Sequence, residues 1–385
     1  MKRISVILTV ITLAFNYSAK AGIADSTDVY LITCAPGTES YSIYGHTALR
    51  IAIRGQQFDR AYNWGIFDFS TPNFVFRFAK GKLDYMLGAY SYEDFLNEYN
   101  YDERSVWSQK INLTTKEKER LFALINENLQ PENIKYRYDF FFDNCATRVR
   151  DIIEKAVSDT IIYQEQVKRS TFRQLIDPCQ KVLPWLDFGA DFLLGLQADR
   201  KASEYDEMFL PMHLRENISG GYILRGNMHE PVLGPPVTVL DFTDKVSEKP
   251  RTYMPQLVFY AVLLFVILVT FVLGVKHLGL ITDILIYLVF SLLALLLIFT
   301  NIFSEHDALH FNLLILAINP LIPVLFFFIV TGKKAVIISR IALTLAVAWF
   351  PVAIIAGQGI NPAIIPLVLV LMVRLFPHCE FGKTI

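Results

Sequence analysis

The chain has 385 residues, of which 53% are hydrophobic and 14% aromatic, and its formal net charge is -1. A near-neutral chain carries no broad positive field, so nucleic acid is not expected as a partner. The apolar residues gather in the last third of the chain. This distribution indicates a soluble domain followed by a membrane domain.

Residues 1–21 have the features of a signal peptide. Two basic residues precede an apolar run from Ile4 to Phe15, and Ala19-Lys20-Ala21 fits the small-x-small cleavage pattern. An uncleaved anchor is the alternative interpretation, although the run is short for a membrane span of about 20 residues. Export would place the soluble domain in an oxidising compartment, where paired thiols tend to form disulfides.

Residues 22–234 predict one periplasmic domain of mixed α+β class. His46 to Ile53 alternates in the manner of a strand, and Asp59 to Phe69 predicts the next strand. A later helix is expected to have Thr114 or Thr115 as its N-cap. The domain is long enough to bury a hydrophobic core of its own.

Cys145 is the candidate nucleophile. It follows an aromatic run and the pair Asp143-Asn144, and an amphipathic helix is predicted to begin there with this pair as its cap. A thiol on the first turn of a helix feels unpaired backbone N–H groups and the positive end of the helix dipole, which favour the thiolate. Its own backbone N–H could then serve as an oxyanion donor. The alternative is that Cys145 is a small buried apolar residue.

His46 is the candidate general base, since an imidazole on a strand of the same domain could take the proton of a thiol. Asn63, on the next predicted strand, could accept a hydrogen bond from the imidazole and fix its tautomer. Asp68 is the reserve candidate for this third role. The competing interpretations are a hydrogen-bonded core histidine and an asparagine that ends a strand.

Arg148 is a candidate substrate-binding residue. It lies three residues after Cys145, one turn along the predicted helix. From there it could favour the thiolate or hold a lipid phosphate by a bidentate contact. A plain salt bridge with Asp143 or Asp151 is an equally good explanation.

The chain has four cysteines, which limits the disulfides it can form. Cys34 and Cys179 could pair, which would leave Cys145 free for chemistry. Cys379 lies beyond the last apolar run, on the expected cytoplasmic side. The bridge between Cys34 and Cys179 stays one open option at this point.

A proline-containing linker, residues 235–256, leads into the membrane domain, residues 257–376. Five apolar runs in this domain are each near the length that crosses a roughly 30 Å hydrocarbon layer as a helix. They cover approximately Leu257 to Val275, Leu280 to Thr300, Phe311 to Val330, Ala335 to Ala356 and Ile360 to Phe376. Lysine and arginine fall in the loops on the side of the C-terminal tail, residues 377–385. The positive-inside rule therefore agrees with a cytoplasmic tail and an exported head.

Polar residues crowd the expected outer loop after the second apolar run and continue into the third run: Glu305, His306, Asp307, His310, Asn312 and Asn319. Polar groups inside a membrane are costly and often functional. His306 and Asn319 could receive a lipid head group or complete the active site, and interfacial hydration with helix capping is the alternative. No metal is expected, because only two imidazoles lie near each other, and no cofactor is implied.

At these residues the chain resembles a known enzyme family. Gly45-His46-x-x-x-Arg50 on a strand, followed by Asn144-Cys145-x-Thr147-Arg148 opening a helix, is similar to the permuted papain-like (NlpC/P60-type) thiol enzymes. More narrowly, four further segments resemble the Bacteroidota lipoprotein N-acyltransferase (Lnb) family: Tyr62 to Phe69, Met208-Phe209-Leu210-Pro211, Ser304-Glu305-His306 and Asn319-Pro320. Asp307 stands where that family often has a proline after the loop histidine.

The resemblance implies a permuted papain-like periplasmic domain followed by a five-helix transmembrane bundle in the inner membrane. It implies transfer of an acyl chain from a phospholipid to the α-amine of a diacylglyceryl-cysteine lipoprotein, through a thioester on Cys145. A membrane-anchored cysteine peptidase or amidase of the cell envelope is the competing enzyme. A non-catalytic lipid-binding or scaffold protein is the third hypothesis.

Overall fold

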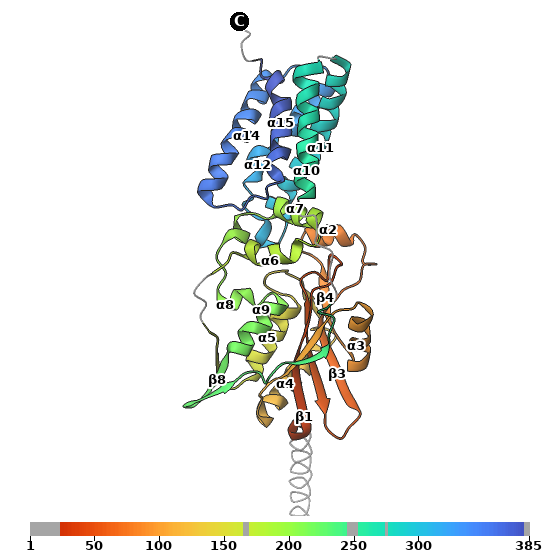
Figure 1. The fold of residues 1–385 in the computed structure, drawn as a ribbon, viewed down its shortest axis with the longest axis vertical. Coiled ribbons are helices and arrows are strands. Elements are labelled where there is room, and N and C mark those ends of the chain that lie inside the picture. The colour runs from red at the N-terminus through yellow and green to blue at the C-terminus, as the bar shows by residue number, and fades with distance from the viewer. Residues whose placement is uncertain (1–23, 165–168, 245–252, 274–275, 381–385) are drawn as a thin grey trace, which may run out of the picture. The chain divides into compact units, whose positions relative to one another are not determined.

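The computed structural model describes residues 24–164, 169–244, 253–273 and 276–380, so the predicted signal peptide lies outside the described residues. The chain divides into two compact units (Figure 1). The sheet unit comprises Met1–Phe74, Leu83–Arg169 and Ala202–Ser247, and the bundle unit comprises Val75–Lys82, Ser170–Lys201 and Glu248–Ile385. The chain is thus of the α+β class, with an N-terminal sheet domain and a C-terminal helical region.

The sheet unit is built on a seven-stranded sheet in the order β10-β5-β1-β2-β3-β4-β6, in which neighbouring strands are antiparallel. Its strands are β1 (Thr27–Cys34), β2 (His46–Ile53), β3 (Phe58–Ile66), β4 (Asp84–Ser91), β5 (Val106–Lys110), β6 (Lys135–Arg137) and β10 (Val237–Leu240). A smaller sheet has the order β7-β8-β9, with β7 (Thr160–Ile162), β8 (Tyr222–Arg225) and β9 (Met228–Pro231).

Strand β2 is buried on both faces of the large sheet. Leu49 and Ile51 join the larger core with residues of α4 (Thr115–Asn128) and α5 (Cys145–Ala156), whereas Ala48 joins a second core with residues of α3 (Tyr92–Tyr101). Because side chains alternate between faces along a strand, a strand covered on both sides is apolar at most positions. Figure 1 shows α3 on one side of the sheet and α5 on the other.

The strand predicted in the alternating part of the segment around His46 is confirmed, and it runs from His46 to Ile53. The next strand runs only from Phe58 to Ile66, shorter than predicted. It ends early because the Asp68 carboxylate accepts hydrogen bonds from the backbone N–H and the hydroxyl of Ser70, which turns the chain.

Several helices in the sheet unit begin at side-chain caps. Thr114 accepts from the backbone N–H of Glu117, whose side chain returns a bond to the N–H of Thr114, so the predicted cap of α4 is confirmed as a capping box. The Ser91 side chain caps α3 by accepting the N–H of Asp94, without a return bond to the N–H of Ser91. The remaining helices of this unit are α8 (Glu204–Glu207) and α9 (Pro211–Gly220).

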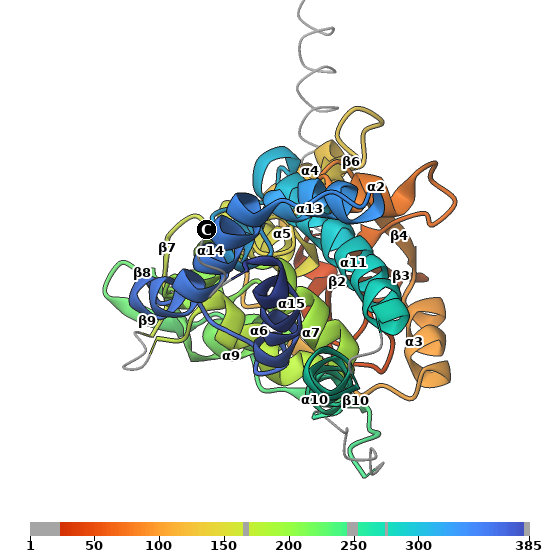
Figure 2. The same cartoon turned by 90° about the horizontal axis from the view of Figure 1, so that it is seen from above.

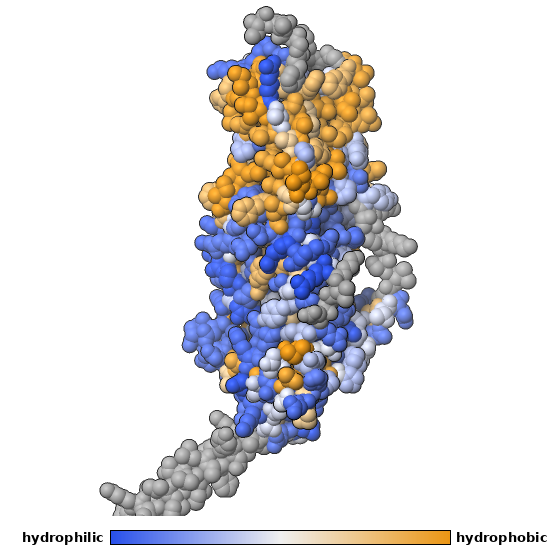
Figure 3. Space-filling view, turned by 90° about the vertical axis from the view of Figure 1, so that its left-hand side faces the viewer, coloured by the Kyte–Doolittle hydropathy of each residue, from blue (hydrophilic) through white to orange (hydrophobic). Residues whose placement is uncertain are grey.

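The bundle unit contains helices long and apolar enough to cross a membrane. Among the described residues, three meet this standard: Met254–Leu273, Leu278–Phe303 and Val336–Ala356. Two further apolar helical stretches, Leu314–Val330 and Ile364–His378, are shorter. The structure therefore supports three of the five expected spans by length and composition. The surface of this unit is largely apolar (Figure 3).

The helical elements of this region are α10 (Met254–Ile267), η2 (Leu268–Leu273), α11 (Lys276–Phe303), η3 (Asp307–Leu309), α12 (Leu314–Ala317), α13 (Leu321–Val330), α14 (Val336–Ala356) and α15 (Ile364–His378). Helix α15 packs against α10, α11 and α14 (Figure 2). The third predicted run is broken into α12 and α13 at Asn319-Pro320. Proline disfavours helical geometry at the residue before it, and the Asn319 side chain accepts the N–H of Leu321 instead.

Two segments from the first 234 residues pack with the helices of the bundle unit. Ser170–Lys201 carries α6 (Phe172–Gln180), α7 (Pro184–Leu193) and η1 (Leu196–Asp199). Arg173 of α6 is buried and binds Asp191 at 2.7 Å and Asp199 at 2.8 Å. The second segment, Val75–Lys82, contains most of α2 (Phe74–Ala79).

Candidate active site

Cys145 is the first residue of α5, as predicted, and Asn144 is the cap that holds it there. The Asn144 side chain accepts the backbone N–H groups of Ala146 at 2.8 Å and Thr147 at 3.0 Å. The Thr147 hydroxyl accepts the N–H of Asn144 in return, at 2.8 Å. The Asn144 amide also donates to the carbonyl oxygen of Phe209, at 2.9 Å, so the start of the helix is tied to a distant segment. Cys145 itself is partly exposed.

His46 begins β2, and Asn63 lies in the adjacent strand β3. The Nε2 atom of His46 and the Oδ1 atom of Asn63 are 2.7 Å apart. Because an amide oxygen only accepts, Nε2 carries the proton and Nδ1 is left able to take one. The Asn63 amide nitrogen donates in turn to the hydroxyl of Tyr90, at 3.0 Å, which orients the amide.

Cys145, His46 and Asn63 lie close together around Gly65, a residue without a side chain. A Cβ atom built on Gly65 would lie 3.1 Å from Cε1 of His46, 3.6 Å from Oδ1 of Asn63 and 3.6 Å from Cβ of Cys145. Strand β3 shifts register here, between Trp64 and Ile66. Sequence reasoning missed Gly65, although a glycine inside a strand pattern is a signal for a bulge or a close approach.

The thiol and the imidazole are both electrically neutral at neutral pH. Burial raises the pKa of Cys145 to about 11, although the backbone N–H groups of Thr47, Ala146 and Cys145 lower it. The helix start does favour the thiolate, as expected, but desolvation outweighs it, so the net shift in pKa favours the thiol. Burial, followed by the charge of Arg104, lowers the pKa of His46 to about 4, against the hydrogen bond to Asn63.

Arg104 is a site component that sequence reasoning missed. Its side chain is only 7% exposed, and no carboxylate among the described residues forms an ion pair with it. Its Nε donates to the carbonyl of Ala35 at 2.9 Å, and its Nη2 has no partner. Its guanidinium lies 4.7 Å from the ring centre of Tyr99, which stacks on His46 at 6.4 Å between ring centroids. A single arginine without a motif around it offers no sequence signal for this position.

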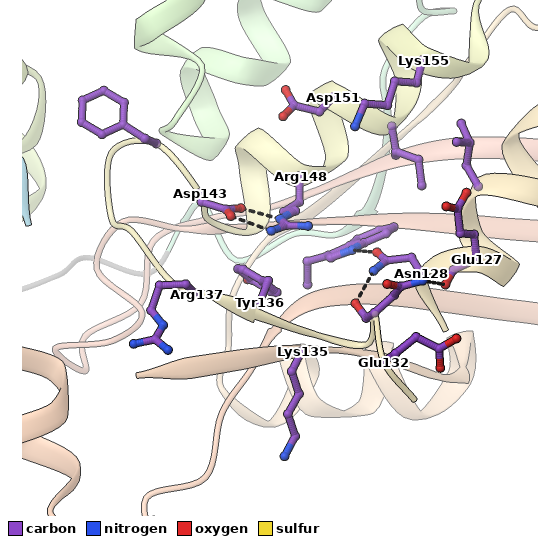
Figure 4. A pocket seen from close by; sticks show the side chains of 15 residues that line it. Glu127, Asn128, Glu132, Lys135, Tyr136, Arg137, Asp143, Arg148, Asp151 and Lys155 are labelled. Atoms are coloured by element: carbon purple, nitrogen blue, oxygen red, sulfur yellow. Dashed lines mark hydrogen bonds and ion pairs between the residues drawn. The ribbon is translucent and has the colours of Figure 1, made fainter. Parts of the chain in front are cut away.

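Arg148 forms a bidentate ion pair with Asp143, which is the salt-bridge alternative weighed for it. Its guanidinium also lies 4.2 Å from the ring centre of Tyr136. These three residues line a pocket of about 750 Å³ with Asn128 and Lys155 (Figure 4). The role of Arg148 in holding a lipid phosphate stays a prediction.

His306 and Asn319 both belong to the bundle unit. The Nε2 atom of His306 lies 2.9 Å from the carbonyl oxygen of Phe78. The amide nitrogen of Asn319 is buried and donates to backbone carbonyls, including that of Ala342 at 3.3 Å. These contacts tie the bundle together, and a substrate role for either residue stays a prediction.

The bridge between Cys34 and Cys179, left as an open option, is not formed, because both residues are free thiols. Cys34 lies on β1 opposite His46 and is fully buried in the sheet, where its thiol interacts with Tyr99 and with the nearby Cys145. Within the described ranges, three or more potential metal-ligating side chains do not gather at any place.

Comparison with known families gives two matches on this chain. Residues 16–177 match the model of the Lnb N-terminal periplasmic domain. Residues 247–383 match the model of the Lnb transmembrane domain. No curated protein and no solved structure matches the chain. The first match contains His46, Asn63, Arg104 and Cys145 together.

Proposed function

Because this chain belongs to the Lnb family, whose periplasmic and transmembrane domains it carries in order, we propose that it is a lipoprotein N-acyltransferase of the inner membrane. It is a membrane protein with a periplasmic part. The proposed acyl donor is a phospholipid, and the acceptor is the α-amine of a diacylglyceryl-cysteine lipoprotein. The observation that carries the proposal is the meeting of Cys145, His46 and Asn63 around Gly65.

In the first half-reaction, the sulfur of Cys145 attacks the ester carbonyl of the phospholipid while its proton passes to Nδ1 of His46. The resting pair is neutral, so sulfur attack and proton transfer are coupled rather than preceded by a stable thiolate. The bond between the carbonyl carbon and the glycerol oxygen then breaks, and His46 returns the proton to that oxygen. The products are a thioester on Cys145 and a lysophospholipid.

In the second half-reaction, the α-amine of the acceptor attacks the thioester carbon. The carbon–sulfur bond breaks, an amide forms, and the amine proton passes through His46 to the sulfur. The free thiol is restored, so the kinetics should be ping-pong. Exclusion of water by surrounding lipid would favour transfer over hydrolysis of the thioester.

The backbone N–H groups that interact with the sulfur are suited to the transition state. That of Cys145 lies at the start of α5 and that of Thr47 follows His46 on β2, whereas that of Ala146 is shared with the Asn144 side chain. Backbone donors held at a helix start can stabilise the oxyanion of a tetrahedral intermediate without reorganisation. In this proposal the fold is a permuted papain-like one, with the nucleophile opening a helix that packs on the strand of the base.

The proposed membrane domain has five spans. Three long apolar helices and two shorter apolar stretches support that number. In this proposal each shorter stretch crosses the membrane together with the residues that flank it. Lys333 and Lys334 precede α14 and Arg340 lies near the start of that helix, at the end that would face the cytoplasm. This charge bias supports an exported sheet unit.

The deciding experiment is intact-mass measurement of the full-length protein incubated with phospholipid alone. We expect an acyl adduct that is absent from Cys145→Ala, and a loss of transfer activity in that variant on the order of a million-fold, as for other knocked-out nucleophiles. A wild-type protein that carries no adduct, or a Cys145→Ala variant that still transfers the chain, would refute the proposal. Cleavage of cell-wall peptides without any acyl adduct would instead identify the peptidase alternative.

A further inference from the structure

A groove in the sheet unit runs along the face of α5 that carries the nucleophile. It is the pocket of about 750 Å³ beside Arg148, here called the α5 groove, and all of its lining residues belong to the sheet unit (Figure 4). Helix α5 contributes Arg148, Asp151, Ile152 and Lys155 to the lining. Positions three, four and seven residues apart lie on one face of a helix, so these side chains share the side of α5 on which Cys145 lies.

The near end of the α5 groove lies at the active site. It is lined by Asp143, two residues before Cys145, and by Trp64, the neighbour of Gly65 in β3. A Cβ atom built on Gly65 would lie 3.6 Å from Cβ of Cys145. The far end is lined by Lys155, in the last turn of α5. The groove therefore leads away from the nucleophile along the helix.

The wall opposite α5 is an edge of the large sheet. All three residues of β6 (Lys135–Arg137) line the groove, and β6 is the last strand in the sheet order. The carbonyl of Ile134 and the N–H of Tyr138 bond toward β4, at 3.0 Å and 3.2 Å. Alternate residues of an antiparallel strand direct their N–H and C=O groups to opposite sides, so those of Lys135 point to the outer edge. An edge strand of this kind can pair with an added extended chain.

The walls of the groove are held in place by hydrogen bonds. Nε1 of Trp64 donates to Oδ1 of Asn128 at 2.6 Å, and the Asn128 amide donates to the carbonyl of Asn133 at 2.9 Å. Tyr136 is 6% exposed, and its buried hydroxyl has no hydrogen-bond partner among the described residues. Buried hydroxyls are normally bonded, so a polar ligand beside Tyr136 could supply a partner that the protein leaves out. A preformed groove also limits the entropy that binding costs.

The charges of the lining are mixed and balanced. Equal numbers of acidic and basic side chains line the groove, and Asp143 already neutralises Arg148. Four further charged lining residues, two of each sign, form no ion pair within the described part of the chain: Glu127, Glu132, Lys135 and Lys155. A phosphate group would favour an excess of positive charge, and a hydrocarbon chain would favour apolar walls. A polypeptide, which carries neutral donors and acceptors at every residue, fits this lining better than either.

We propose that the α5 groove binds the polypeptide that follows the lipidated cysteine of the acceptor, in an extended conformation beside the outer edge of β6. The inference rests on the proposed function and names the acceptor-binding element of the same site. The attacking α-amine and the start of the polypeptide belong to one residue, so the chain of the acceptor must leave from the sulfur of Cys145. The α5 groove begins at that point.

The length of the groove sets the length of peptide that it holds. Lys155 lies ten residues after Cys145 on α5, which is about 15 Å of helix at a rise of about 1.5 Å per residue. An extended peptide covers that distance with about five residues, at about 3.3 Å per residue. The first five or so residues after the lipidated cysteine should therefore contribute to binding, and later ones should not.

The first test is photo-crosslinking of the full-length protein in detergent micelles to a synthetic diacylglyceryl-cysteine lipopeptide. Benzoylphenylalanine replaces Lys135, Lys155 or, as a matched control, Lys116, an exposed lysine in the first turn of α4 that does not line the groove. We expect lipopeptide adducts at positions 135 and 155 and none at 116. Absence of lipopeptide adducts at both positions would overturn the inference. Adducts to added phospholipid in their place would overturn it too, and would assign the groove to the donor.

The second test varies the lipopeptide and leaves the protein unchanged. The KM for the acceptor should fall about tenfold as the peptide after the cysteine grows from about two to about five residues, and then stay constant. Methylation of one backbone nitrogen at a time should raise this KM by about three to tenfold at alternate positions, because only alternate residues bond to the edge of β6. A KM that does not depend on peptide length would overturn the inference, and equal effects of methylation at every position would overturn pairing with β6.

The two proposals can fail separately. Crosslinking to the lipopeptide does not need a working nucleophile, so it is repeated in the Cys145→Ala background. Lipopeptide adducts at position 155 without any acyl adduct on wild-type Cys145 would refute the proposed function and still support the groove as a peptide site. An acyl adduct from phospholipid without lipopeptide adducts at 135 and 155 would refute the peptide site alone.

Discussion

The hydrogen bond between Asn63 and His46 should govern how well the imidazole works as a base, and Asn63→Ala tests it. The bond is 2.7 Å long and joins Oδ1 to Nε2. In the resting site the bond is made to a neutral ring and stabilises it by a net free energy of about 0.5–1.5 kcal/mol. The same bond to the imidazolium contributes about 1.5–3 kcal/mol. The difference of about 1–1.5 kcal/mol favours the protonated ring that forms during sulfur attack.

A difference of that size corresponds to about a tenfold slower acylation of Cys145 in Asn63→Ala, at 1.36 kcal/mol per decade. Loss of the tautomer that places the free electron pair on Nδ1 adds to this, so we expect a fall of roughly ten to a hundredfold in kcat/KM. The pKa of His46 should fall below its value of about 4, because the bond to Asn63 is the interaction that raises it.

The assay is the single-turnover rate of acyl-adduct formation, followed by mass, with the melting temperature as a check on folding. Tyr90→Phe is the matched control, since it removes the acceptor of the Asn63 amide, at 3.0 Å, and leaves the bond to His46 in place. It should slow acylation by about threefold or less. A folded Asn63→Ala variant with a rate within about twofold of wild type would refute the orienting role.

Three further outcomes follow from the geometry of the site. Gly65→Ala places a methyl group 3.1 Å from the imidazole and should slow acylation at least about tenfold. Gly189→Ala, where no atom lies within 4 Å of the added methyl group, should acylate at the wild-type rate. Equal acylation rates in both variants would contradict the close packing at Gly65. Arg104→Gln should raise the pKa of Cys145 and of His46, because the arginine charge lowers both, and Arg104→Lys should keep both values near those of wild type. The pH dependence of iodoacetamide alkylation measures the change, and identical pH profiles for wild type and Arg104→Gln would remove Arg104 from the site. Folded His46 has a pKa of about 4 against an ordinary value of 6.5, so its contribution to stability is fully present above about pH 6.5 and is lost as the pH falls toward 4. Over that range the melting temperature of wild type should therefore fall more steeply than that of His46→Gln. Melting temperatures that fall in parallel in the two proteins would contradict a lowered pKa of His46.

Local patterns along the chain were enough to place the nucleophile and its neighbours on the right elements. Asn144 caps α5 and Thr114 caps α4 through bonds that span three residues or fewer. Such bonds depend on residue types that are adjacent in sequence. The existence of the strand after His46 was equally accessible, since alternation of apolar residues is itself a local signal. This reasoning missed the break between α12 and α13 at Asn319-Pro320. That break also has a local cause, because proline disfavours a helix at the preceding residue.

The protonation state of the site could not be predicted in this way. A helix start favours a thiolate, and the N–H groups at Cys145 do lower its pKa, but burial raises it more. Burial is the sum of everything packed around the sulfur, so it depends on the whole fold rather than on the residues beside Cys145. The same holds for Arg104, which comes to the site from the segment just before β5 and has no motif of its own.

By itself the sequence determined which residues are the candidates for the chemistry, where several of the secondary structures begin, and that the last third of the chain is apolar enough for a membrane. Only the tertiary structure decided that Cys145 and His46 meet across Gly65, that Cys34 and Cys179 stay unpaired, and that α2 packs on the end of α11. The physical reason is the range of the interactions. Caps and alternation act over a few residues, whereas the contact of Phe76 with Phe299 and the burial of a thiol arise only when distant segments pack together.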